Sequence, residues 1–175
     1  MELTTAHEIN YKGEPCIELK AGGYLAIIAP GIGSNVIRLR DEANDIEIFR
    51  FCDTVTVDEI KQSPEVYGLP TLYLPNRLNG GKLKTSDACY QLPVNEPALG
   101  NFIHGFLHKR QHSIVEVMAT EEQAIAKTEY LYDENDDYFQ YLPIKFKAEF
   151  TFTLSEQGFT YAFTMTNLSD RQMPY

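Results

Sequence analysis

The sequence has no tryptophan and is short of positive charge, with 15 lysines and arginines against 25 aspartates and glutamates. A net charge of -10 repels a polyanion, and the basic residues form no stripe, so we expect no nucleic-acid binding. No apolar run approaches the roughly 18 residues of a membrane span. The first 15 residues lack the basic and apolar regions of a secretion signal. These absences predict a cytoplasmic protein that does not contact a membrane.

Cysteine is also scarce. Cys16, Cys52 and Cys89 are odd in number and lie far apart in the sequence. Without a secretion signal, such cysteines are more often buried thiols in a reducing compartment than disulfide partners. We therefore expect three buried free thiols.

Short alternating runs are the strongest pattern that is present. Residues 145–154 alternate apolar and polar side chains at all ten positions, which fits a strand and not a helix. Residues 155–158 form a turn that ends in Gly158, and residues 159–166 repeat the alternation. The pattern predicts an antiparallel hairpin.

Similar runs occur earlier in the chain, separated by glycine and proline turns, and they predict an all-β protein with an antiparallel β-sandwich. One short helix is expected just before Pro64, and an acidic loop at residues 133–137. No repeat or linker divides the chain, so residues 1–175 are expected to form one domain or part of one. The other expected strands are residues 16–20, 24–29, 35–40, 46–51, 113–118 and 124–132, and the helix is residues 57–62.

Two motif-like stretches have simpler interpretations. Residues 31–36, GIGSNV, lack the third glycine and the following helix of a dinucleotide-binding loop, so they predict a turn. His104, His108 and His112 have a spacing of four, which on a helix could hold zinc. Gly105 lies inside this stretch and a β-branched run follows it, so the three rings are not expected to converge. We expect neither a metal site nor a cofactor.

Asn76, Arg77 and His104 are the candidate binding residues. Pro75 precedes Asn76 and Arg77 and two glycines follow closely, which places the guanidinium at a sharp turn after an apolar run. His104 likewise follows two apolar residues and precedes a glycine, and a glycine lets another group approach the backbone closely. If each residue is considered alone, the alternatives are that Arg77 is a surface arginine or a salt-bridge partner and that His104 is a core histidine.

At these residues the sequence resembles the aldose 1-epimerases, or galactose mutarotases. The resemblance lies in residues 68–77 (GLPTLYLPNR), 78–81 (LNGG), 103–106 (IHGF) and 166–174, with a looser match at residues 30–35. It implies a large antiparallel supersandwich that binds a sugar in a shallow cleft. It also implies interconversion of the α and β anomers of an aldose such as galactose or glucose, without metal or organic cofactor.

The resemblance further implies roles for individual residues. Arg77 would clamp sugar hydroxyls, since a planar guanidinium can hold two oxygens at once. His104, the one catalytic candidate in this chain, would hydrogen-bond the sugar near its ring oxygen, and Asn76 would shape the turn or orient Arg77. The general acid, a histidine, and the general base, a glutamate, are expected beyond residue 175, so the sequence corresponds to an N-terminal half and should be inactive alone.

Two alternatives and one structural consequence remain open at this point. A non-catalytic carbohydrate-binding module could keep Arg77 and His104, and a metal-binding module could use the three histidines. Half of a sandwich would expose the aromatic face of the last hairpin. We expect either a homodimer or the missing half to cover that face.

Overall fold

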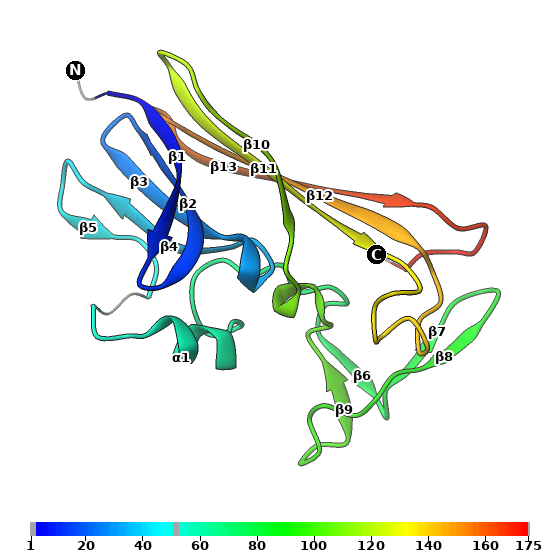
Figure 1. Ribbon diagram of the computed structural model, residues 1–175. Helices are drawn as coiled ribbons and strands as arrows, with labels where there is room; N and C mark the ends of the chain where they lie inside the picture. Colours follow the sequence, from blue (N-terminus) through cyan, green and yellow to red (C-terminus); the bar gives the residue numbers. More distant parts are fainter. Residues whose placement is uncertain (1–2, 51–52, 175) are drawn as a thin grey trace.

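The computed structural model describes residues 3–50 and 53–174, and nearly all of its regular structure is antiparallel β-sheet (Figure 1). A five-stranded sheet has the order β1-β2-β3-β4-β5, and a four-stranded sheet has the order β10-β11-β12-β13. Two short pairs, β6-β9 and β7-β8, lie together at one end of the molecule (Figure 1). The strands are β1 (Thr5–Tyr11), β2 (Glu14–Ala21), β3 (Tyr24–Ala29), β4 (Asn35–Asp41), β5 (Ile46–Glu47), β6 (Arg77–Asn79), β7 (Lys82–Lys84), β8 (Cys89–Gln91), β9 (Asn101–Ile103), β10 (Ser113–Ala119), β11 (Gln123–Tyr132), β12 (Phe146–Ser155) and β13 (Gly158–Asn167), and the helices are η1 (Pro30–Ile32), α1 (Val57–Gln62) and η2 (Leu107–Lys109).

The predicted C-terminal hairpin is confirmed. In β12 the residues at alternate positions from Phe146 to Leu154 are buried, and Ser155 pairs with Gly158. The loop is therefore two residues long, Glu156 and Gln157, rather than four. The buried face of β12 belongs to an apolar cluster that also contains Ile17 of β2, so the two large sheets share one core. This shared core confirms the antiparallel sandwich.

Most of the other predicted elements are confirmed, and the differences have simple causes. The sequence did not reveal β1, because its side chains are exposed or half-buried on both faces and show no clean alternation. It also did not reveal the short strands β6 to β9, which have three residues each. The predicted strand at residues 46–51 shrinks to the two residues of β5, and residue 51 lies outside the described residues.

Helix α1 occurs where it was expected. Thr56 caps it: its hydroxyl accepts from the backbone N–H of Glu59 at 3.2 Å, and the Glu59 carboxylate accepts from the backbone N–H of Thr56 at 2.8 Å. This reciprocal pair satisfies two backbone donors that a helix start leaves free. Residues 31–36, predicted as a turn, form the end of η1, two left-handed positions at Gly33 and Ser34, and the start of β4.

The cysteine prediction is correct at one position and wrong at another. Cys16 is a free thiol that is 1% exposed, and burial raises its pKa to about 12. Cys89 is also free but exposed, because it alternates with the buried Tyr90 on the short strand β8 and faces the other side. Cys52 lies outside the described residues.

A buried asparagine connects β4 to the segment that leads to the candidate site. The Asn35 side chain donates to the carbonyls of Pro64 and Tyr67 at 3.1 and 3.0 Å, and it accepts from the N–H of Leu69 at 2.9 Å. Buried side-chain amides need such partners, and here they fix the backbone of residues 64–69 against the five-stranded sheet. The chain then continues toward Asn76 from a defined position.

Strand β13 is an edge strand with a partly exposed apolar face. Phe163 is 38% exposed although its ring packs 5.2 Å from that of Phe150. One side of the β13 backbone has no neighbouring strand among the described residues. The expectation that the last hairpin presents aromatic surface is thus confirmed for its outer strand.

Candidate functional site

The stretch that holds Asn76 and Arg77 is paired through its backbone with the stretch that holds His104. Strand β6 pairs with β9, and Arg77 lies opposite Ile103. The pairing continues beyond the strands, since His104 donates its backbone N–H to the carbonyl of Asn76 at 3.0 Å and Phe106 donates to that of Tyr73 at 3.0 Å. The two stretches that sequence analysis singled out are therefore neighbours in space.

Gly105 makes this close pairing of the two backbone stretches possible. Its φ is +66°, and a Cβ at this position would lie 1.8 Å from the carbonyl oxygen of Tyr73. No side chain fits there, because real Cβ contacts do not approach so closely. Asn76 and His104 have φ values of 61° and 63°, which are uncommon for residues with side chains and are found more often at functional sites than elsewhere. The local backbone thus turns sharply at both candidate residues.

Arg77 is a salt-bridge partner, as one of the alternatives for this residue had it. Its Nε lies 2.9 Å from Oε2 of Glu96 and its Nη2 lies 2.8 Å from Oε1, in a two-point ion pair. Asn101 adds a third donor, with its Nδ2 at 3.0 Å from Oε2 of Glu96. The hydrogen bonds from Arg77 and Asn101 lower the pKa of Glu96 to about 2. Glu96 is therefore a carboxylate at any pH near neutrality.

His104 lies next to the Asn76–Arg77 stretch. Its backbone N–H donates to the carbonyl of Asn76, the residue that precedes Arg77, at 3.0 Å. Nδ1 of His104 is buried and has no hydrogen-bond partner among the described residues. Arg77 and Asn76 are exposed, and His104 is half-buried. The three candidate residues therefore gather at one end of the β6-β9 pair.

Glu96 is a partner of Arg77 that the sequence did not indicate. It lies 19 residues after Arg77 in the connection between the two motifs, and no periodicity relates it to either one. Only the pairing of β6 with β9 brings its carboxylate to the guanidinium. A tertiary contact of this kind leaves no local pattern in the sequence.

His108 and His112, which were not expected to converge with His104 on a metal, are part of the core. His112 is stacked on Phe150 with ring centroids 4.7 Å apart, and its Nδ1 lies 2.9 Å from Oγ of Ser34, which in turn contacts Oγ1 of Thr128 at 2.6 Å. His108 is 2% exposed, and its Nε2 lies 3.9 Å from Oε2 of Glu65. Within residues 3–50 and 53–174, no group of three or more metal-ligating side chains is arranged to hold an ion.

We predict that these two buried imidazoles make the protein sensitive to acid. Burial lowers the pKa of both His108 and His112 to about 4, whereas an unfolded histidine has a pKa of about 6.5. Between these values the unfolded chain binds more protons than the folded one, so the free energy of unfolding falls as the pH decreases. The expected loss from pH 7 to pH 5 is on the order of 1 kcal/mol for each imidazole.

Urea unfolding at pH 7 and pH 5 measures this loss. His112→Gln keeps a polar partner for Ser34 but cannot titrate, so the difference between the two pH values should shrink. Equal unfolding free energies of the unsubstituted protein at both pH values would contradict the prediction.

The acidic loop at residues 133–137 is confirmed as a loop, but one of its carboxylates is buried. Asp136 accepts from Nε and Nη2 of Arg110 at 2.7 and 2.8 Å and also from the hydroxyl of Tyr130. The Asp136 side chain is 3% exposed. The loop therefore has a structural ion pair and is not simply a solvated acidic segment.

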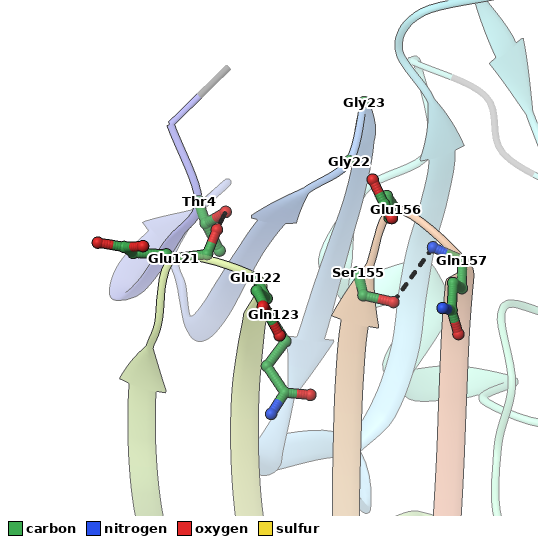
Figure 2. A pocket seen from close by; sticks show the side chains of 9 residues that line it. All are labelled: Thr4, Gly22, Gly23, Glu121, Glu122, Gln123, Ser155, Glu156 and Gln157. Atoms are coloured by element: carbon green, nitrogen blue, oxygen red, sulfur yellow. Dashed lines mark hydrogen bonds between the residues drawn. The ribbon is translucent and has the colours of Figure 1, made fainter. Parts of the chain in front are cut away.

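A cavity of about 750 Å³ lies away from the candidate site, where three turns meet (Figure 2). Its lining includes the turn glycines Gly22 and Gly23 together with Glu121, Glu122 and Glu156. Gly22 is tightly packed, since a Cβ there would lie 2.1 Å from the Cα of Glu156. Neither Arg77 nor His104 belongs to this lining.

Comparison with solved structures identifies the fold. The structure is similar to a galactose mutarotase-like protein from Clostridium acetobutylicum, with a TM-score of 0.90, 29% identity, and coverage of 95% of this chain and 50% of that one. It is also similar to galactose 1-epimerase from Lactobacillus acidophilus, with a TM-score of 0.71, 16% identity and coverage of 95% and 49%. A galactose mutarotase-like protein from Lactobacillus casei gives a TM-score of 0.64, 14% identity and coverage of 91% and 47%.

These likenesses confirm the partial supersandwich that the sequence resemblance implied. The chain spans about half the length of the solved structures it matches. None of the helices within the described residues has the length and apolar character needed to cross a membrane. The family model described as aldose 1-epimerase matches residues 15–175, and the chain therefore belongs to the aldose 1-epimerase family.

Proposed function

We propose that the protein interconverts the α and β anomers of an aldohexose such as galactose or glucose. The family match over residues 15–175 carries this proposal. The placement of Arg77 and His104 at one end of the β6-β9 pair supports it, because a sugar ring needs several polar contacts from one direction.

The chemistry assigns a role to each candidate. Ring opening removes a proton from the C1 hydroxyl and delivers one to the ring oxygen, and reclosure after rotation about C1–C2 gives the other anomer. Arg77 would hold sugar hydroxyls through its remaining donors, and His104 would hydrogen-bond the sugar near its ring oxygen. Asn76 is exposed and has a φ of 61°, which suits a residue that shapes the turn and aims Arg77.

The proton-transfer pair is proposed to lie beyond residue 175. The other histidines of this chain do not occupy a matching position: His108 and His112 are buried, and His7 lies on β1 in the five-stranded sheet. A histidine acid and a glutamate base from the remaining half would complete the site. A positioned acid and a positioned base contribute about 10²- to 10⁴-fold each. No metal or organic cofactor enters this scheme, and a cytoplasmic location remains a prediction of the sequence.

We further propose that residues 1–175 form the N-terminal part of a single sandwich domain. The shared core of the two large sheets supports this, and so does the partly exposed face of β13. The remaining half or a second copy of the chain would cover the Phe163 side of this edge strand.

Polarimetry on freshly dissolved α-galactose tests the proposed function. The full-length protein should accelerate the approach to the anomeric equilibrium, and residues 1–175 alone should leave the spontaneous rate unchanged. Strong acceleration by residues 1–175 alone would show that the acid and base lie within this chain. No acceleration by the full-length protein would contradict an epimerase function.

A non-catalytic carbohydrate-binding protein is the second candidate. The observations that favour it are that the Arg77 side chain is 50% exposed and that Nδ1 of His104 has no hydrogen-bond partner among the described residues, so both could bind a sugar without any proton transfer. Calorimetric titration with galactose separates the two, since a binding module would bind the sugar without accelerating mutarotation.

A further inference from the structure

The ion pair between Arg77 and Glu96 uses only part of the guanidinium. Glu96 accepts from Nε at 2.9 Å and from Nη2 at 2.8 Å, which leaves Nη1 without a hydrogen-bond partner among the described residues. Two parallel bonds of this kind fix the plane of the guanidinium as well as its position. The Arg77 side chain is still 50% exposed, so its remaining donors are open to a ligand.

Glu96 is itself held by the strands that carry the site. Its backbone N–H donates to the carbonyl of Asn101 at 2.9 Å, and the N–H of Asn101 donates back at 3.2 Å. The Asn101 side chain also donates to Oε2 of Glu96 at 3.0 Å. Asn101 begins β9, pairs with Asn79 of β6, and lies three residues before His104. The carboxylate is therefore fixed to both strands that carry the candidate residues.

The residue before Glu96 also binds the connection between β8 and β9 to β9 itself. The side chain of Asn95 accepts from the N–H of Ile103 at 2.7 Å and donates to its carbonyl at 2.9 Å. Ile103 lies opposite Arg77 in the β6-β9 pair. The connection cannot move relative to the guanidinium without breaking these bonds.

We propose that Glu96 is the positioning residue of Arg77, which it holds in one orientation so that the remaining donors face the sugar. A long arginine side chain that is free in solution loses rotamer freedom when it binds a ligand. The pair with Glu96 removes that freedom before the sugar arrives. Glu96 acts through Arg77 and does not touch the sugar, because its oxygens already accept from Arg77 and Asn101. This inference rests on the proposed epimerase function.

Kinetics of Glu96→Gln in the full-length protein test this role. Glutamine replaces one of the two acceptor oxygens with an NH2 group, which is a donor, so the two-point pair is lost while the side chain keeps its size. We expect KM for galactose to rise about tenfold and kcat to change less than about twofold, because Arg77 contacts the sugar in the ground state and the transition state alike. The melting temperature should stay almost constant, since exposed ion pairs add little stability.

The double variant with Arg77→Ala separates positioning from a general structural effect. If Glu96 acts through Arg77, Glu96→Gln should cause no further loss once Arg77 has been removed. Glu116→Gln is the matched control, because it removes the same charge from an ion pair between Glu116 on β10 and Lys127 on β11 and should leave KM unchanged.

The outcomes distinguish this inference from the proposed function. An unchanged KM for Glu96→Gln, or an equal loss with and without Arg77, would overturn the positioning role while leaving the epimerase function in place. If the unsubstituted protein does not accelerate mutarotation at all, the proposed function fails and the positioning role fails with it.

Discussion

Replacing Gly105 with alanine should destabilise the protein by about 3 kcal/mol or more, because the new methyl group overlaps a backbone carbonyl that cannot move aside. A Cβ at Gly105 would lie 1.8 Å from the oxygen and 1.9 Å from the carbon of Tyr73. Tyr73 is fixed in turn, since its carbonyl accepts from the N–H of Phe106 at 3.0 Å and its side chain is 4% exposed. The positive φ of +66° adds further strain for any residue with a Cβ.

Gly100→Ala is a closely matched control for this prediction. Gly100 has a φ of +68°, but no atom lies within 4 Å of the position its Cβ would take. The free energy of unfolding of this variant should fall by only about 1 kcal/mol, which is the cost of a left-handed backbone for a residue with a Cβ. Thermal and urea unfolding of both variants measure the difference. Similar losses for the two variants would show that the close contact of Gly105 with Tyr73 is unimportant.

Replacing Arg77 with alanine should lower kcat/KM of the full-length protein for galactose by about 10- to 150-fold. This loss corresponds to roughly 1.5–3 kcal/mol, the scale of hydrogen bonds to a charged group. Arg77 is 50% exposed and its pair with Glu96 is exposed as well, so the fold itself should be little affected. Mutarotation followed by polarimetry gives the rate, and circular dichroism verifies that the variant is folded.

Two further variants sharpen the Arg77 prediction. Arg77→Lys keeps the positive charge but cannot form the two-point pair with Glu96, so it should restore only a small part of the activity. Arg40→Ala removes an arginine from another ion pair, with Glu47 in the five-stranded sheet, and should leave kcat/KM unchanged. If Arg77→Ala keeps the full kcat/KM, the guanidinium does not bind the sugar.

The candidate site was only partly predictable. The stretch around Asn76 and Arg77 and the one around His104 could be found because a glycine or proline beside a single polar group leaves a local pattern. The partner of Arg77 could not be found, since Glu96 reaches it through the pairing of β6 with β9. The sequence did predict that His104, His108 and His112 do not converge, but only the fold shows that the last two are buried in the core.

The sequence by itself determined the long strands and their hairpin. In β12 the alternation of side chains fixes which face is buried, because a strand turns successive residues to opposite sides. The tertiary structure alone decided which strands pair across long separations, that Gly105 meets the Tyr73 carbonyl, and that Arg77 is held by Glu96. Contacts between residues far apart in the chain depend on how the sheets pack as a whole, and no local periodicity encodes them.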